Sequence, residues 1–173
     1  ITVAKDVKLQ VEFNPATVAN YRLIGYENRV MAAEDFRDDT KDAGEIGAGH
    51  SVTALYEIVP RGVAPGRGAE PLKYQQQPEP PVLKGADGEP SDDLLTVKLR
   101  WKQPEGSVST LKEFPLADRG AAFEEASDDL RFASAVASFG MLLRGSKESG
   151  EMTYKKVGRI AGESLGADPG GYR

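Results

Sequence analysis

The sequence predicts an α+β domain in which a mainly antiparallel, sandwich-like sheet region is followed by a C-terminal helical hairpin. Three observations support this fold class. Apolar and polar residues alternate with the period of a strand in two regions, a Pro- and Gly-rich stretch separates these regions, and the last third follows the spacing of a helix. Strands that come first and helices that come last are typical of α+β folds. A length of 173 residues agrees with a single domain over residues 1–173.

The first β-rich region covers residues 1–59. From Val7 to Phe13, apolar side chains alternate with polar ones, so four apolar groups lie on one face of the predicted strand. The Asn-Pro pair that follows favours a turn, because proline has no backbone N–H for a sheet ladder. We expect further strands over residues 21–26 and 51–59. The second of these is largely apolar or β-branched on both faces, which predicts a central strand covered on both sides.

Residues 60–93 contain most of the eleven prolines of the chain and show no periodic apolar pattern, so we predict a flexible surface connection. A second β-rich region covers residues 94–117. Apolar residues alternate from Leu95 to Trp101, a Pro-Glu-Gly turn follows, and a strand returns from Val108 to Leu116. This pattern predicts an antiparallel hairpin with one solvent-exposed face.

The helical region is predicted over residues 121–166. Ser127 is a good N-cap, and the two Asp residues after it lie where the helix dipole favours negative charge. Apolar residues then recur at three- and four-residue spacing, and the Arg-Gly pair at 144–145 is typical of a C-terminal end. A second helix is expected to start near Thr153 and to end before Gly166.

The composition excludes several functional classes. A formal net charge of -5 argues against nucleic-acid binding, which depends on neutralising phosphates. Without cysteine there is no disulfide, thiolate nucleophile or sulfur-ligated zinc, and a single histidine cannot form a multi-histidine metal centre. No apolar run approaches the roughly 18 residues of a membrane-spanning helix, so we expect no membrane insertion by this segment. No cofactor pattern is present either, and the domain is predicted to be non-catalytic.

An acidic stretch over residues 34–45, here called the acidic segment, leaves a metal site open as an alternative. Clustered carboxylate oxygens are the ligands that calcium prefers. The spacing does not fit an EF-hand loop, and a solvated acidic loop is the simpler interpretation. The calcium-binding alternative would use Asp35, Asp38, Asp39, Asp42 and Glu45.

The single histidine, His50, lies in a glycine-rich segment over residues 44–51. A phosphate-binding loop would follow a strand, open a helix and place Lys before the Ser, whereas here His takes that place and a strand follows. A tight turn is therefore the better interpretation. An envelope hydrolase that uses His50 with Ser51 or another Ser is the less favoured alternative, because a catalytic triad depends on geometry rather than on adjacency in sequence.

Long blocks of the sequence resemble a known bacterial family. In order, and over nearly the whole chain except the Pro- and Gly-rich connection, they are similar to the C-terminal region of bacterial von Willebrand factor type A domain-containing proteins, which are lipoprotein-like. A series of long blocks in the same order is far more specific than a short motif. The blocks are residues 5–15, 21–29, 42–58, 93–100 and 132–144.

The resemblance implies that a von Willebrand A domain precedes this region in a lipid-anchored cell-envelope protein or a secreted one. The Asp-x-Ser-x-Ser motif of the A domain's metal site is absent from this sequence, so no metal ligand is transferred. We therefore expect a non-catalytic accessory domain that mediates protein–protein interaction, with the upstream A domain and an unknown protein as partners. Strand edges near residues 1–30 are expected to be completed by segments that precede the A domain.

Overall fold

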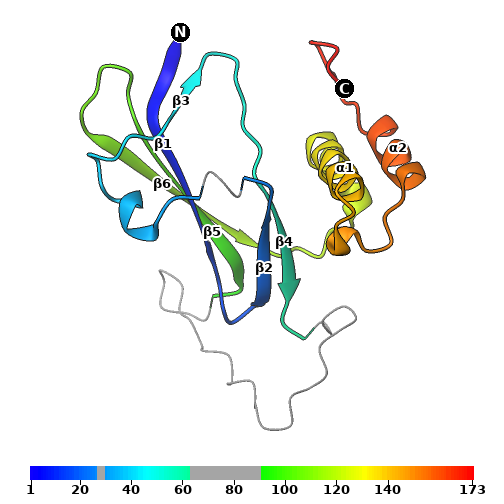
Figure 1. Ribbon diagram of the computed structural model, residues 1–173. Helices are drawn as coiled ribbons and strands as arrows, with labels where there is room; N and C mark the ends of the chain where they lie inside the picture. The colour runs from blue at the N-terminus through cyan, green and yellow to red at the C-terminus, as the bar shows by residue number, and fades with distance from the viewer. Residues whose placement is uncertain (27–29, 63–90) are drawn as a thin grey trace. The chain divides into compact units, whose positions relative to one another are not determined.

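The computed structural model describes residues 1–26, 30–62 and 91–173 (Figure 1). Most of the predicted connection over residues 60–93 therefore lies outside the described residues. Mostly antiparallel sheets come first along the chain and two α-helices come last, which confirms the predicted α+β class.

The described chain forms two compact units, one rich in β-strands and one helical. The two units hold separate sets of internal contacts. The prediction of a single domain stays a prediction. The β-rich unit consists of Ile1–Val52 and Tyr56–Asp118, and the helical unit consists of Thr53–Leu55 and Arg119–Arg173.

The larger sheet of the β-rich unit has four strands in the order β3–β1–β5–β6, and each neighbouring pair is antiparallel (Figure 1). The β5–β6 pair is the hairpin that the alternation of apolar residues predicts. In its register, Val97 lies opposite Phe114. The strands are β1 (Thr2–Phe13), β3 (Gly44–Gly47), β5 (Asp93–Lys102) and β6 (Ser109–Ala117).

A smaller sheet of the same unit contains β2 (Val18–Ile24) and β4 (Leu55–Pro60). The Phe13 ring, at the end of β1, stacks on the Tyr21 ring of β2 with the centroids 3.9 Å apart. The Tyr56 ring of β4 lies 5.4 Å from the same Phe13 ring in a tilted arrangement. These aromatic contacts join the two sheets at one end of β1.

The prediction of a central strand over residues 51–59 is wrong in extent and in place. Residues 51–54 are exposed and not part of a strand, and within the described residues β4 pairs with β2 in a two-stranded sheet. The apolar residues of β4 suggested a neighbouring strand on each side. Instead, Tyr56 of β4 packs against the Phe13 ring, which belongs to the larger sheet.

The register of the larger sheet sorts its side chains onto two unlike faces, because directly paired residues of antiparallel strands point to the same side. We call these the apolar face and the polar face. The apolar face includes Leu9, Val11, Phe13, Leu95, Val97, Leu99, Phe114 and Leu116. The polar face includes Lys8, Gln10, Glu12, Lys98, Arg100, Lys102, Ser109 and Glu113.

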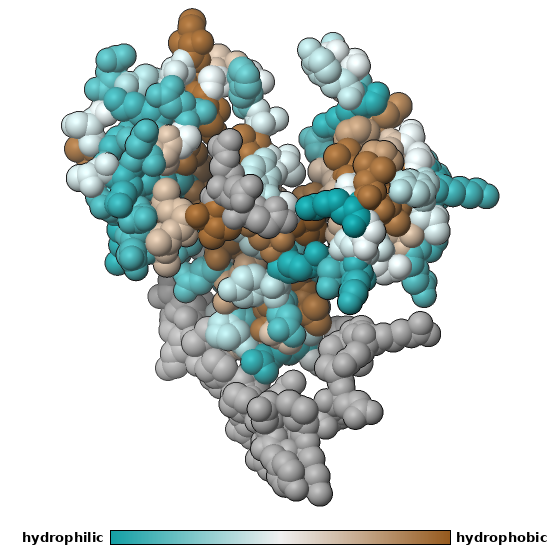
Figure 2. Space-filling model, viewed as in Figure 1, coloured by the Kyte–Doolittle hydropathy of each residue, from teal (hydrophilic) through white to brown (hydrophobic). Residues whose placement is uncertain are grey.

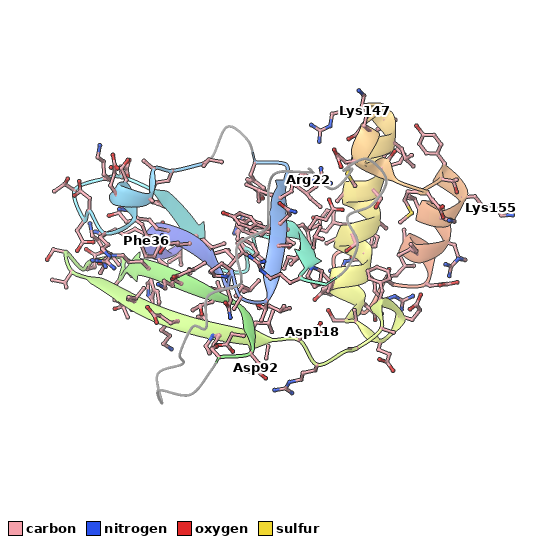
Figure 3. All side chains as sticks on the ribbon, turned by 90° about the horizontal axis from the view of Figure 1, so that it is seen from below. Arg22, Phe36, Asp92, Asp118, Lys147 and Lys155 are labelled. Carbon is pink, nitrogen blue, oxygen red and sulfur yellow. The ribbon has the colours of Figure 1, made fainter. Side chains whose placement is uncertain are left out.

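A short 3-10 helix, η2 (Ala33–Phe36), lies against β1 and brings the start of the acidic segment to the larger sheet (Figure 3). Its last residue, Phe36, is buried, as are Val18 of β2 and Leu95 of β5. Hydrophilic residues crowd the side of the β-rich unit that carries η2 (Figure 2).

The helical unit confirms both predicted helix starts. Ser127 Oγ accepts a hydrogen bond from the Leu130 amide, and Thr153 Oγ1 accepts one from the Lys156 amide. Its core consists of Ala135, Val157 and Ile160. No helix in the described part of the chain has the length and apolar character needed to span a membrane. The helices are η3 (Phe123–Glu125), α1 (Asp128–Leu143), η4 (Lys147–Ser149) and α2 (Tyr154–Gly162).

Candidate functional site

Lys8 fixes the acidic segment to the polar face of the larger sheet. It lies on β1, and only 4% of its surface is exposed. Its Nζ donates hydrogen bonds to the backbone carbonyls of Asp35, at 3.1 Å, and of Asp38. A buried lysine is costly unless it is paired, and here two carbonyl oxygens at the end of η2 meet the charge. Lys8 therefore sets the distance between η2 and β1.

Asp39 is held by three side chains of the polar face. Its Oδ1 accepts hydrogen bonds from the Arg100 guanidinium, through Nε and Nη2 at 3.2 Å each, and from Ser109 Oγ at 2.6 Å. Lys102 Nζ donates to the backbone carbonyl of Asp39 at 2.7 Å. The same Nζ donates to Asp6 Oδ2, also at 2.7 Å. Cations from β1 and β5 thus neutralise an acidic segment that is distant in sequence.

Asp6 reaches this cluster because β1 is irregular at that point. The register between β1 and β5 shifts between Lys5 and Lys8, and Asp6 has a φ of 51°, in the left-handed region that non-glycine residues rarely adopt. The Asp6 carboxylate also accepts a hydrogen bond from the Ala43 amide at 3.3 Å. The contacts of Asp6 with Lys102 and with the chain that leads into β3 therefore offset the cost of its strained backbone conformation.

Hydrogen bonds lower the pKa of three carboxylates in this part of the chain. The hydrogen bond from Ser109 lowers the pKa of Asp39 below its ordinary value, and Arg100 adds to the effect. The hydrogen bond from Lys102 lowers the pKa of Asp6, and hydrogen bonds from Thr40 lower the pKa of Asp38. Donors that favour the charged form are the common cause.

Three of the five side chains of the calcium-binding alternative contact different partners. Asp39 pairs with Arg100, Asp35 lies 3.6 Å from Lys41, and Glu45 accepts a hydrogen bond from Thr2. Across the described residues, no three or more His, Cys, Asp or Glu side chains lie close enough together to hold a metal ion. This includes Asp38 and Asp42. Calcium binding stays a prediction that a titration can test.

His50 and Ser51 are both exposed, in the turn after β3. The His50 amide donates to the Gly47 carbonyl at 3.1 Å, which is the tight turn that the glycine-rich segment predicts. The imidazole lies so close to Gly47 that a Cβ there would come within 3.1 Å of His50 Nδ1. The hydrolase alternative and the expected lack of catalysis both stay predictions.

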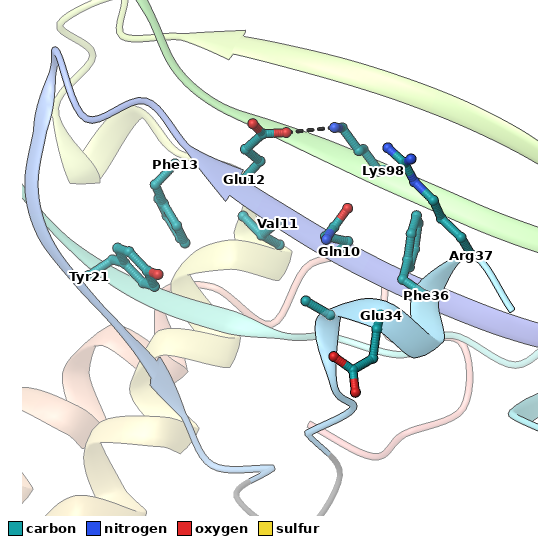
Figure 4. A pocket seen from close by; sticks show the side chains of 10 residues that line it. Gln10, Val11, Glu12, Phe13, Tyr21, Glu34, Phe36, Arg37 and Lys98 are labelled. Atoms are coloured by element: carbon teal, nitrogen blue, oxygen red, sulfur yellow. Dashed lines mark hydrogen bonds and ion pairs between the residues drawn. The ribbon is translucent and has the colours of Figure 1, made fainter. Parts of the chain in front are cut away.

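An open groove of about 730 Å³ lies beside β1, next to the clamped acidic segment (Figure 4). Phe13 and Tyr21 stand at one end of it and Phe36 stands towards the other, and the β1 strand runs along it (Figure 4). Glu12 and Lys98 form an ion pair on its wall, with Nζ and Oε2 2.6 Å apart. The lining residues are Gln10, Val11, Glu12, Phe13, Tyr21, Ala33, Glu34, Phe36, Arg37 and Lys98.

A second surface is the part of the apolar face that β2 and β4 leave open. The exposed fractions are 52% for Leu9, 49% for Phe114 and 54% for Leu116. By contrast Leu95, which is paired with Leu116 and lies on the same face, is only 7% exposed. Phe114 and Leu116 are neighbours on β6, and Leu9 lies on the same face two strands away. Exposed apolar side chains gathered on one sheet face are typical of an interaction surface.

Comparison with known proteins places the chain in a family. Residues 1–173 match the family model described as "Uncharacterized protein YfbK, C-terminal". The chain belongs to this family. It is 43% identical over its full 173 residues to the protein named "Uncharacterized protein YfbK" from Escherichia coli (strain K12). The chain spans 28% of the length of this curated relative. No solved structure matches the chain.

The family match confirms part of the resemblance that the sequence blocks indicate. The chain corresponds to the C-terminal region of a longer bacterial protein, as predicted. The link to a von Willebrand A domain is a finer statement and stays a prediction.

The sequence did not predict the groove or the clamp that holds the acidic segment. The signal for the clamp was present, since Lys98, Arg100 and Lys102 alternate along one strand and so share a face. A row of cations and an acidic stretch in one chain are expected to attract each other. The groove had no such signal, because its walls come from four segments that only the fold brings together.

Proposed function

We propose that this region is a non-catalytic interaction domain that packs against the polypeptide preceding it in a longer protein. The observation that carries the proposal is the open part of the apolar face, where Leu9, Phe114 and Leu116 are each about half exposed. An apolar sheet face is normally buried against another layer, because exposed apolar surface is unfavourable in water. The length of the curated relative outside the match supplies a candidate for that layer.

The preceding polypeptide contains, in this proposal, a von Willebrand A domain, and the longer protein resides in the cell envelope or is secreted, with a lipid anchor. The support is the resemblance of the sequence blocks to the C-terminal region of A-domain proteins. Reading the complete gene tests it directly. An Asp-x-Ser-x-Ser motif within an α/β domain upstream of residue 1 is the expected result, and its absence would remove the A domain from the proposal.

Association between this chain and the preceding polypeptide, produced separately, tests the interaction itself. We expect binding by calorimetry, weakened at least about tenfold by the double change Phe114→Ser and Leu116→Ser, because burial of these side chains supplies much of the affinity. Glu113→Ser is the matched control, since Glu113 directly precedes Phe114 on β6 but points to the polar face. Equal affinity of the double variant and the control would contradict the proposed surface.

A further inference from the structure

The outer edge of β1 is unpaired along the groove. β3 pairs with β1 at Thr2, Ala4 and Val7, and the last of these pairs joins Val7 to Gly44, the first residue of β3. From Lys8 to Phe13, β1 pairs with β5 on its inner side. In the described part of the chain, the sheet order puts no further strand on its outer side.

The groove reaches this edge of β1 and also extends over the polar face, where Lys98 of β5 lines it. Four consecutive residues, from Gln10 to Phe13, line it. Because successive strand residues point to opposite faces, a pocket on one face would take only alternate residues. In an antiparallel pair, alternate residues direct both their N–H and their C=O outward, so this stretch presents about four backbone groups to the groove. Backbone donors and acceptors of this kind pair with an added strand.

We propose that this groove binds an extended segment of the preceding polypeptide of the longer protein, which adds to β1 as a further strand. The inference rests on the proposed function, in that the region works as part of a longer protein. It adds a second contact that is distinct from the apolar face and that is made through the backbone.

The shape of the groove favours a single extended strand over a second copy of the chain. η2 stands beside β1, and Lys8 fixes its position through the carbonyls of Asp35 and Asp38. If the β1 edges of two copies approached each other, each copy would place its η2 helix between them. A single extended strand has no flanking helix and therefore meets no such obstacle. The occupant is therefore a segment of extended chain.

The shortness of the edge favours a segment of the same polypeptide over a separate peptide. About four backbone groups over four residues make few hydrogen bonds, so a free peptide gains little affinity against the entropy of association. A tethered segment has a high effective concentration and binds through the same few contacts. Most of the curated relative lies outside the match, since the chain covers 28% of it.

The walls of the groove specify the side chains that the segment carries. Phe13 and Tyr21 form an aromatic end, and the buried Phe36 ring lines the η2 side, so apolar residues at alternate positions fit there. Glu34 and Arg37 place opposite charges on the η2 wall, which suits a segment with polar or charged residues at the intervening positions.

Hydrogen exchange of the intact longer protein, compared with the 173-residue chain alone, tests the inference. We expect the outward-facing amides of residues 9–13 to exchange at least about tenfold more slowly in the longer protein, because the added strand accepts their hydrogen bonds. Helix α1 is the internal control, since neither proposed contact involves it, and its amides are expected to exchange at similar rates in both proteins. Equal exchange of residues 9–13 in the two proteins would overturn the inference.

A pair of variants separates strand addition from simple burial. Ala33→Trp fills the groove from η2 without removing a contact, and Ala32→Trp places the same side chain on the neighbouring exposed residue, outside the lining. In the longer protein we expect Ala33→Trp to restore fast exchange in β1 and Ala32→Trp to preserve protection. Protection that survives Ala33→Trp, or that appears in the chain alone at high concentration, would overturn the inference, the latter in favour of a second copy.

The outcome is separable from that of the proposed function. Phe114→Ser with Leu116→Ser acts on the apolar face, and Ala33→Trp acts on the groove. Loss of affinity in the first variant with unchanged β1 exchange in the longer protein would leave the interaction domain in place and remove the added strand. Protection of β1 in the longer protein, together with unchanged affinity of the Phe114→Ser and Leu116→Ser variant, would support the added strand and remove the apolar face as the interaction surface.

Discussion

On the polar face of the larger sheet, Lys8, Arg100 and Lys102 are joined to the acidic segment of the same chain, whereas on the apolar face Leu9 and Leu116 remain about half exposed. Contacts within the chain thus cover part of the polar face, although it has the alternating charges of a solvent-exposed face. The rest of it borders the groove at Gln10, Glu12 and Lys98. On the apolar face, Phe13 meets the rings of β2 and β4, and Leu95 is buried. The comparison indicates that the apolar face is the one of the two that leaves large apolar side chains open to a partner, whereas the groove offers a separate site beside β1.

The largest expected effect compares two leucines that face each other across β5 and β6. Leu95→Ala removes a buried side chain and leaves a cavity, so we expect a loss of about 2–4 kcal/mol in the free energy of unfolding. Leu116→Ala acts on its half-exposed partner, and a loss below about 1 kcal/mol is expected. Urea denaturation of the 173-residue chain measures both. Equal losses would show that the apolar face is already covered within the chain.

On the polar face, Lys8→Met should destabilise the β-rich unit by about 1–3 kcal/mol, because the carbonyls of Asp35 and Asp38 lose a charged donor. Thermal and urea unfolding provide the measurement. Lys112→Met is the control, since Lys112 is exposed and points to the apolar face, and its effect should stay within about 0.5 kcal/mol. If both variants were equally stable, Lys8 would not be the anchor of η2.

The pH dependence of stability sharpens the same contrast. The pKa values of Asp6, Asp38 and Asp39 are lower in the folded chain than the unfolded value of about 3.9. Their contribution is therefore present above about pH 4 and is lost as the pH falls through the lower folded values. We expect the free energy of unfolding to fall between about pH 5 and about pH 2, and to fall less steeply in Asp39→Asn. An unchanged slope in that variant would exclude Asp39 as a contributor.

The smallest expected effect concerns calcium. Because Asp39 is engaged by Arg100 and Ser109, and no metal-binding group is found among the described residues, millimolar calcium should leave the midpoint of thermal unfolding unchanged. A rise in the midpoint that depends on calcium concentration would instead support the calcium-binding alternative, because a ligand that binds the native state alone must stabilise it.

Local features of the fold were predictable because they depend on neighbouring residues. The cap at Ser127, the start of the second helix at Thr153 and the β5–β6 hairpin follow from side chains within a few positions of each other. The place of β4 was not predictable. Apolar side chains on both faces of a strand indicate that both faces are covered, but they do not indicate whether other strands or aromatic rings cover them. The clamp on Asp39 also joins residues 61 and 70 positions apart.

The sequence by itself determined the α+β class, the helix caps and the alternation that gives the larger sheet one charged and one apolar face. Hydrophobic periodicity and helix capping depend on residues close together in sequence, so they can be recognised without knowledge of the rest of the chain. The tertiary structure alone decided that the acidic segment neutralises the charged face and that the edge of β1 faces a groove. Both depend on which distant segments meet, and that is set by the register between strands and by the backbone at Asp6 rather than by any short pattern.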